Sequence, residues 1–265
     1  MARRFAAHPR VVAQYSNALD ACQPSLLRQV YGLSKLLIHK LVPATCLLCL
    51  DPGQPPFLDL CRECEDDLPR NAGACPGCAM PMAAPATRCA ECASRSPAFD
   101  AAFAPYRYEF PLVELIHRLK YGNQIAIARI LGTVLAHRLA ERGKPAVDAL
   151  VPVPLHRARE AHRGYNQAAE IARFAAEQFG LPVLHRAALR VRATEEQAAL
   201  PASVRRVNVS GAFEAIPGTL PAAVAIVDDV LTTGATADAL ALALKRAGCR
   251  RVETWAVARA SGAQR

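Results

Sequence analysis

One segment near the C-terminus constrains the fold more than any other part of the chain. Residues 224–236 read VAIVDDVLTTGAT, which predicts a buried strand at Val224–Val227 with two adjacent carboxylates, Asp228 and Asp229, at its C-terminal end. Ligands of open α/β sheets bind at that end of the strands. Carboxylates accept hydrogen bonds and vicinal ribose hydroxyls donate them, so the pair is predicted to hold a sugar ring and could support a hydrated Mg²⁺.

The loop that follows the acids has the features of a phosphate site. It enters a helix predicted over residues 235–247, and the first N–H groups of a helix lack internal partners and carry partial positive charge. Threonine hydroxyls add donors, and the glycine lets the backbone approach a ligand closely. The residues predicted to contact the phosphate are Thr232, Thr233, Gly234, Ala235 and Thr236. The lysine of a Walker loop is absent, and the alternative interpretation is a solvated turn in which Thr233 merely caps the helix.

Eight of the ten cysteines form four Cys-x-x-Cys pairs, and these are Cys46/Cys49, Cys61/Cys64, Cys75/Cys78 and Cys89/Cys92. The pairs are separated by 11, 10 and 10 residues, a spacing typical of zinc ribbons, in which two such pairs complete one tetrahedral site. We expect two structural zinc ions, bound by the first pair with the second and by the third with the fourth. A cross-braced arrangement, first with third and second with fourth, is the alternative. Iron–sulfur ligation and thioredoxin-like redox chemistry are less favoured.

Composition and charge narrow the class of protein. Apolar residues make up 52% and charged residues 21%, values typical of a globular chain. The formal charge of +9 favours anionic partners, but thiolate ligation of zinc would leave the balance only mildly basic, so charge alone does not identify a nucleic-acid binder. No apolar run approaches the ~18 residues of a membrane helix, and Arg3 and Arg4 are not followed by the apolar region of a secretory signal. A reducing cytoplasm is therefore the expected compartment.

Three segments differ in composition and are predicted to be separate parts of the chain. Residues 1–45 form a basic extension whose apolar side chains from Leu26 to Leu41 recur at helical spacing. This helix is predicted either to dock on the protein or to lie on a membrane surface as a peripheral contact. Residues 46–98 hold the cysteine pairs and need metal to stabilise so small a module. Residues 99–265 alternate strand-like and helix-like patterns.

The last segment is predicted to form an α/β domain. The predicted strands lie at 99–108, 149–153, 224–227 and 251–258, and the predicted helices at 111–121, 124–142, 164–179 and 235–247. Strands and helices that alternate at these lengths indicate right-handed crossovers and a mostly parallel sheet flanked by helices. Residues 190–210 are predicted to form a long basic flap, since long loops in compact domains serve as lids or binding elements.

Basic side chains gather in the predicted loop between the strand at 149–153 and the following helix. Pro152 and Pro154 stiffen the exit from that strand. The basic residues that follow are His156, Arg157, Arg159, His162 and Arg163. Arginine presents a fork of donors and lysine a point charge, so this cluster and Lys120 are predicted to neutralise a pyrophosphate. A solvated basic face is the alternative.

The segment at 224–236 resembles the phosphoribosyl-pyrophosphate (PRPP) signature of type I phosphoribosyltransferases along its whole length. The resemblance implies the sheet of that family, with flanking helices, and a Mg²⁺-bound pyrophosphate. It also implies that Asp228 and Asp229 act as the catalytic residues by holding the ribose hydroxyls, while the loop holds the 5′-phosphate. The predicted PRPP contacts are then Thr232, Thr233, Gly234, Ala235, Thr236, Lys120, His156, Arg159 and Arg163.

Further segments are similar to the ComF/GntX group of competence-related proteins. These segments are Leu119–Gly122, Val151–His156, Arg163–Gln167 and Arg190–Thr194. That group also carries a double zinc ribbon before its phosphoribosyltransferase-like domain, so the resemblance covers most of the chain. It implies a role in DNA uptake during transformation, with single-stranded DNA and the uptake machinery as partners.

The sequence leaves functions of different classes open. The first is an enzyme that transfers phosphoribosyl from PRPP to an unknown acceptor with loss of pyrophosphate. The second is a non-catalytic protein that handles single-stranded DNA, and the third is a sensor of PRPP without turnover. A nucleotide-salvage phosphoribosyltransferase is the alternative enzyme, although no segment is typical of a hood that reads a base. Tyrosines near basic residues, the candidates for base stacking, are Tyr106, Tyr108, Tyr121 and Tyr165.

Overall fold

The computed structural model describes residues 44–54, 59–83, 87–192, 209, 211–218 and 220–261. The chain divides into two compact units, Met1–Ala44 and Thr45–Arg265, and the described helices and strands all lie in the second. The predicted helix of the N-terminal extension and most of the predicted flap at 190–210 lie outside the described residues.

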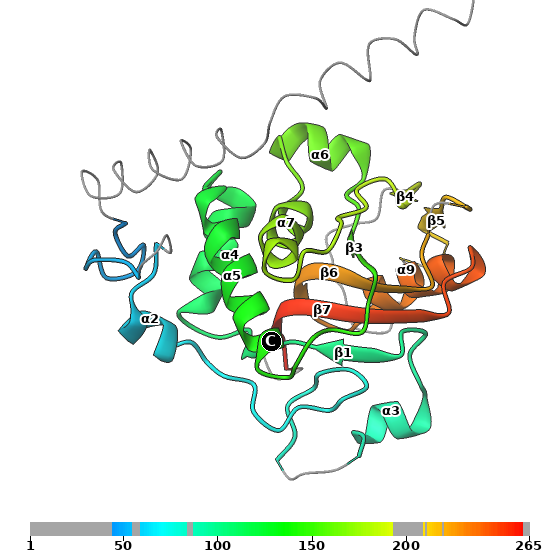
Figure 1. Ribbon diagram of the computed structural model, residues 1–265, viewed down its shortest axis with the longest axis horizontal. Coiled ribbons are helices and arrows are strands. Elements are labelled where there is room, and N and C mark those ends of the chain that lie inside the picture. Colours follow the sequence, from blue (N-terminus) through cyan, green and yellow to red (C-terminus); the bar gives the residue numbers. More distant parts are fainter. Residues whose placement is uncertain are drawn as a thin grey trace, which may run out of the picture. The chain divides into compact units, whose positions relative to one another are not determined.

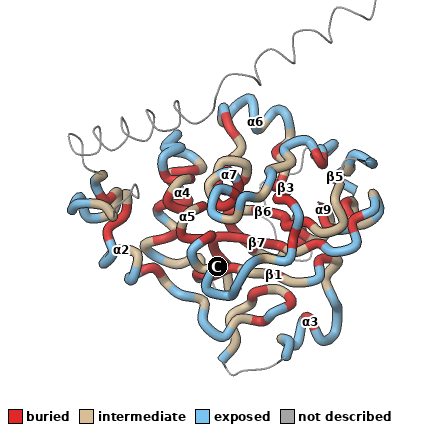
Figure 2. The backbone as a smooth tube through the Cα atoms, viewed as in Figure 1, coloured by how far each residue is buried: buried red, intermediate tan, exposed pale blue. Residues whose placement is uncertain are grey.

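A parallel sheet forms the centre of the second unit (Figure 1). Its strands are β1 (Ala101–Phe103), β2 (Tyr106–Arg107), β3 (Ala149–Pro152), β6 (Ala223–Leu231) and β7 (Arg251–Arg259). The strand order is β1-β7-β6-β3, with β2 also beside β7, and each of these pairings is parallel. β3, β6 and β7 are largely buried (Figure 2), as expected of parallel strands covered on both faces. The predicted fold class, a mostly parallel sheet flanked by helices, is confirmed.

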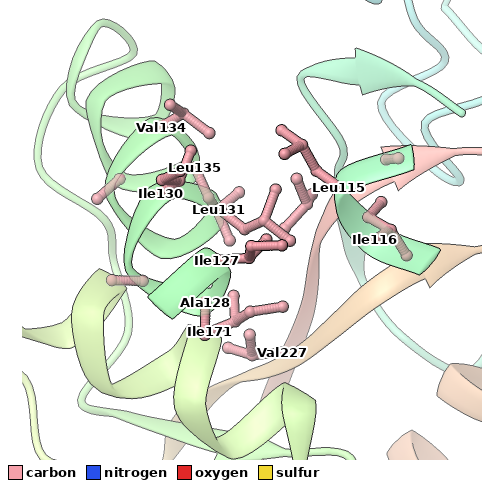
Figure 3. Close-up of a cluster of buried hydrophobic side chains, with 14 of the residues drawn as sticks. Leu115, Ile116, Ile127, Ala128, Ile130, Leu131, Val134, Leu135, Ile171 and Val227 are labelled. Atoms are coloured by element: carbon pink, nitrogen blue, oxygen red, sulfur yellow. The ribbon is translucent and has the colours of Figure 1, made fainter. Parts of the chain in front are cut away.

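Helices cover the two faces of this sheet unequally. On one face α4 (Leu112–Tyr121), α5 (Ala126–Ala140) and α7 (Gln167–Phe179) pack against alternate residues of β6, of which Val227 is one (Figure 3). A side chain on Gly132 of α5 would come within 2.6 Å of a carbonyl of α7, so this glycine permits the close approach of the two helices. α9 (Ala235–Arg246) covers the other face and packs on Val224 and Ile226. The alternation from Val224 to Val227 therefore places neighbouring residues of β6 in two separate cores.

Several local elements differ from the predictions. The strand predicted at 99–108 is two short strands, because Pro105 between them has no N–H for a ladder bond and its carbonyl accepts from Asn71. The predicted basic loop contains a short helix, α6 (Arg157–Arg163), which begins at a His156 cap and ends at Gly164 with φ of 82°. β4 (Ala188–Arg190) and β5 (Phe213–Ala215) form an antiparallel pair that the sequence did not predict.

The cysteine segment adds two short helices, α2 (Arg62–Asp66) and α3 (Ala90–Ser94), one in each half. Within the part of the chain that the structure describes, no helix combines the length and apolar character needed to cross a membrane.

Candidate functional site

The two acids lie where β6 extends beyond its neighbour β3. β3 ends with Pro152 paired to Val227, whereas β7 stays paired with β6 as far as Leu231. The strand is thus longer than the predicted 224–227, and Asp228 and Asp229 are part of it. They stand at the carboxyl end of the parallel sheet, the position at which open α/β sheets bind ligands.

Lys120 places a positive charge against the acidic pair, Asp228 and Asp229. It comes from the last turn of α4, and its Nζ lies 2.7 Å from Oδ2 of Asp229, whose side chain is only 4% exposed. Burial alone would lower the pKa of Lys120, but the carboxylate of Asp229 outweighs that effect and raises the pKa, so the lysine stays charged. Burial and the neighbouring Asp229 together raise the pKa of Asp228 to about 8. A cation bound at this carboxyl would oppose that shift.

The phosphate loop, residues 231–236, connects β6 to α9 as predicted. Gly234 precedes α9 with φ of 78°, a left-handed conformation that favours glycine. Oγ1 of Thr233 accepts a hydrogen bond from the N–H of Ala235 at 3.3 Å, but the N-cap of α9 is Gly234, which has no side chain to cap the helix. The loop thus lies after the acids and directly before a 12-residue helix.

The predicted basic contacts occupy different places in the structure. Lys120 forms a direct ion pair with Asp229 of the acidic pair. His156 begins α6, and its Nδ1 accepts from the N–H of Ala158 at 3.3 Å. Arg163 donates to Gln167 at 2.7 Å and lies over the ring of Tyr121, 5.6 Å from the ring centre. Arg159 is half-buried on α6.

Two arginines near the site were missed in the sequence. Arg190, on β4, lies 5.5 Å from the centre of the Phe213 ring. Its pKa is lowered, first by burial and then by the charge of Arg159, whereas the charge of Asp228 acts to raise it. Its charge therefore lies near both the acidic pair and α6. Arg259, at the end of β7, donates from Nη1 to the carbonyl of Leu231 at 2.8 Å and also to that of Thr232. Arg190 begins one of the ComF/GntX-like segments, although its place beside the acidic pair was not predicted, whereas no local motif marks Arg259.

The tyrosines proposed for base stacking also separate in the structure. Tyr106 and Tyr165 are buried, and the hydroxyl of Tyr165 donates to the carbonyl of Leu119 in α4. Tyr108 is half-buried. Tyr121 is 57% exposed, and its ring centre lies 4.8 Å from that of His117. Tyr121 is therefore the tyrosine of this set with an accessible ring.

The cysteines form two tetrahedral-sized clusters from neighbouring pairs. One contains Cys46, Cys49, Cys61 and Cys64, the other Cys75, Cys78, Cys89 and Cys92, and the sulfurs within each lie within 4.8 Å of one another. The Cys49–Cys61 and Cys78–Cys89 sulfurs are each 3.6 Å apart, close to the ~3.8 Å edge of a tetrahedron with zinc–sulfur bonds of ~2.3 Å. The predicted pairing is confirmed, the cross-braced alternative is wrong, and each cluster could bind a structural zinc.

The two clusters belong to a structural repeat. In the first module, which carries Cys46 to Cys64, Thr45 forms a bridge with Pro52; in the second module, which carries Cys75 to Cys92, Ala74 does so with Pro81. The third cysteine of each module precedes a short helix, α2 or α3. This repeat places the thiols alike in both modules.

Backbone N–H groups point at sulfurs in both modules, as zinc thiolates require. Burial by itself would raise the pKa of Cys46, but hydrogen bonds from the backbone of Cys49, Cys61 and Leu48 lower it to about 6. In the second module the N–H of Cys89 lies 3.3 Å from the Cys75 sulfur. These donors favour the thiolate at Cys46 and Cys75, whereas burial and the neighbouring sulfurs raise the pKa of Cys64 and Cys92. All-cysteine ligation of a zinc would leave no coordination position for a substrate.

The fold and the two kinds of site define a class of protein. Its members combine an α/β domain, which has an acidic pair and a threonine loop at the edge of the sheet, with two tetracysteine modules. Over 222 residues the chain is 32% identical to the DNA utilization protein YhgH of Salmonella typhi. The matched region covers 82% of this chain and 98% of that protein. It is 33% identical over 208 residues to Competence protein F of Haemophilus influenzae, covering 76% of this chain and 90% of that protein.

A third relative, Competence protein ComFC of Streptococcus pneumoniae, is 24% identical over 204 residues and covers 76% of this chain and 87% of that protein. No family model matches the chain. The identity and coverage of the first two relatives nevertheless show that the chain belongs to the ComF/GntX family, as its motifs predict.

Proposed function

We propose that this protein binds PRPP with Mg²⁺ at the carboxyl end of β6 and acts in DNA uptake. The observation that carries the proposal is the juxtaposition of the acidic pair, Lys120 and the phosphate loop at the end of one strand. Lys120 Nζ lies 2.7 Å from Asp229, so the site already contains a cation and an anion that a ribose phosphate could engage.

Each part of PRPP has a matching group in this proposal. Asp228 and Asp229 accept hydrogen bonds from the ribose hydroxyls, and the amides and hydroxyls of the phosphate loop hold the 5′-phosphate. Mg²⁺ would neutralise pyrophosphate charge and would be held by the ligand with help from the acidic pair. Arg190 is suited to bind the pyrophosphate of PRPP, and Arg159 lies close enough to affect the pKa of Arg190.

The role in DNA uptake rests on relatives whose names refer to DNA utilization and competence. A DNA contact has one structural observation in its favour. The exposed ring of Tyr121 carries Arg163 on it, and an aromatic ring beside a guanidinium suits the stacking of an unpaired base next to its phosphate. The proposal leaves three alternatives for what happens to bound PRPP. These are phosphoribosyl transfer to an acceptor, a nucleotide-salvage reaction, and sensing of PRPP without turnover.

A calorimetric titration of PRPP tests the ligand, with and without Mg²⁺. We expect one site per chain and a loss of at least about a hundredfold in affinity for the double variant Asp228→Asn/Asp229→Asn, because each acid accepts hydrogen bonds from the sugar. Asp148→Asn is the matched control: Asp148 also accepts a backbone hydrogen bond at β6, but at Ala223, the opposite end of the strand. Equal affinity in the double variant and the control would refute PRPP binding at this site.

The DNA contact is tested separately with a fluorescent single-stranded oligonucleotide. Tyr121→Ala is expected to weaken binding by about tenfold, as loss of one stacked base would do. Affinity should also fall with rising salt, because phosphate contacts release counterions. Binding that is indifferent to both changes would contradict a stacking site at Tyr121.

A further inference from the structure

A single buried guanidinium joins the second metal module to the phosphate loop. Arg259 is 2% exposed, and its Nε donates to the carbonyl of Cys78, a residue of the second cluster, at 2.9 Å. From the other side of the same planar group, Nη1 donates to the carbonyl of Leu231 at 2.8 Å and to that of Thr232. The loop and the metal knuckle are therefore attached to one rigid donor group.

The charge of Arg259 fits this location once metal is bound. The carbonyl oxygens that accept its hydrogen bonds have only partial negative charge. A zinc ion with four thiolates, by contrast, carries a formal charge of about −2, and Cys78 would be one of its ligands. A buried cation needs countercharge close by; the charges of Cys78 and of Glu91 on α3 act on Arg259, and the thiolates of a bound zinc would add to them.

A second contact holds the other end of the loop. Asp238, in the first turn of α9, accepts a hydrogen bond from the N–H of Ala98, and its Oδ2 lies 3.9 Å from Arg95. Residues 95–98 directly follow α3 of the second module. The loop is thus attached to this module at its first two residues, Leu231 and Thr232, and just after it ends, at Asp238.

Between these two attachments the loop is not supported by close packing. A pocket lies behind it, lined by residues that include Cys78, Cys92, Phe99, Thr233, Gly234 and Arg259. Even an added side-chain carbon on Gly234 would come no closer than 3.9 Å to the Phe99 ring. Around Gly234 the loop is therefore held by its polar attachments and not by close packing against Phe99.

We propose that Arg259 is a positioning residue through which the second metal module, but not the first, holds the phosphate loop in its ligand-binding conformation. The inference deepens the proposed function and rests on it for the identity of the ligand. Because coupling between two sites is reciprocal, a ligand on the loop also stabilises metal in the second cluster.

The test compares Arg259 with Arg138, a largely buried arginine at the first module, in the full-length zinc-loaded chain. Arg259→Gln removes the fork at the second module. Arg138→Gln is the matched control, because Arg138 is 12% exposed, donates to Tyr106 at 3.2 Å and lies 3.6 Å from Glu65 beside the first module. Three quantities are measured for both variants. They are the hydrogen–deuterium exchange of peptides covering 231–240, the zinc content by mass spectrometry, and the affinity for PRPP with Mg²⁺ by calorimetric titration.

We expect Arg259→Gln to retain zinc, to exchange at 231–240 about tenfold faster and to bind PRPP about tenfold more weakly, as loss of a hydrogen-bonded guanidinium would do. Arg138→Gln should leave exchange and affinity within about twofold of the wild type, since it does not contact the loop. Arg259→Lys should recover only part of the loss, because lysine keeps the charge without the fork. If Arg259→Gln does not fold, Arg259→Lys and Asp238→Asn provide the same comparison.

The outcomes separate the two proposals. Unchanged loop exchange in a folded Arg259 variant overturns the positioning role, whatever the wild type binds. Faster exchange in that variant alone, together with no PRPP binding by the wild type, supports the positioning role and refutes the proposed ligand. Equal effects of Arg138→Gln and Arg259→Gln on the loop would show a general loss of structure and would also overturn the inference.

Discussion

The two tetracysteine modules have the same local structure but contact different parts of the protein. Leu60, Cys46 and Cys61 of the first module are part of the larger core, together with Leu115 of α4 and Leu131 of α5. The second module contributes Ala79 to the smaller core, and the neighbouring Phe99 lies in that core as well. It also contacts Arg259 and, through residues 95–98, Asp238. A repeated metal-binding unit can therefore support global stability at one place and the geometry of a binding loop at another.

The first module should matter most for stability. Leu60→Ala removes a fully buried side chain from the larger core, and we expect a loss of about 2–5 kcal/mol in the free energy of unfolding. PRPP affinity should stay within about twofold of the wild type at a temperature where the variant is folded. Urea unfolding followed by titration checks both. A loss of affinity without a loss of stability would reverse the assignment of the two modules.

Lys120 is an exception to this division between the modules, because it contacts the acidic pair from a helix that is bound to the first module. Its helix, α4, also carries Arg118, which donates to the carbonyl of Leu47 in the first module at 3.4 Å. Lys120→Met leaves the buried Asp229 without its cation, and we expect a loss of about 2 kcal/mol or more in unfolding free energy.

A double-mutant cycle with Asp229→Asn measures the coupling between the lysine and the acid in that prediction. A coupling energy of about 1 kcal/mol or more is expected for a close, partly buried pair. Additive effects of the two substitutions would mean that the 2.7 Å contact contributes nothing to stability.

The acidic pair should give PRPP binding a pH dependence that neither module supplies. Burial and Asp229 raise the pKa of Asp228 to about 8, so at pH 7 this carboxyl is mostly protonated. A ligand with Mg²⁺ that favours the carboxylate must displace the proton, and affinity should rise about tenfold between pH 7 and pH 9 before levelling off. Titrations at both values check this, and Asp228→Asn, which cannot ionise, should show the smaller dependence that belongs to the ligand alone.

The smallest effect is expected at the edge of the second module. Arg95 is 62% exposed and lies 3.9 Å from Asp238, so Arg95→Ala should change the free energy of unfolding by no more than about 1 kcal/mol. The hydrogen bond from the N–H of Ala98 to Asp238 remains in this variant, and loop exchange should be nearly unchanged. A large effect would mean that the exposed ion pair, rather than Arg259, attaches the loop.

The sequence predicted those parts of the fold and site that depend on local patterns. Residues 224–236 predicted the strand, acids, loop and helix, because apolar runs and glycine turns act over a few residues. Cysteine spacing likewise predicted which pairs share a cluster. The extent of β6 was underestimated, because the strand is continued past Val227 by pairing with β7 rather than by its own composition.

Long-range contacts account for what the sequence missed. Arg259 contacts Cys78, a residue far away in the chain, and no periodicity or motif encodes that distance. Arg190, whose pKa responds to Asp228, lies on β4, and the β4–β5 pair consists of two strands of three residues each, too short to predict. α6 has few apolar residues, and its ends are set by a histidine cap and a glycine that also fit a loop.

The most direct test of the division between the modules is an exchange map of two variants, Cys61→Ser and Cys89→Ser, each lacking one ligand of one cluster. Cys61→Ser is predicted to speed hydrogen exchange in α4 and α5, which share the larger core with the first module. Cys89→Ser is predicted to speed exchange at 231–240 while α4 and α5 stay protected. The same regions losing protection in both variants would contradict the account.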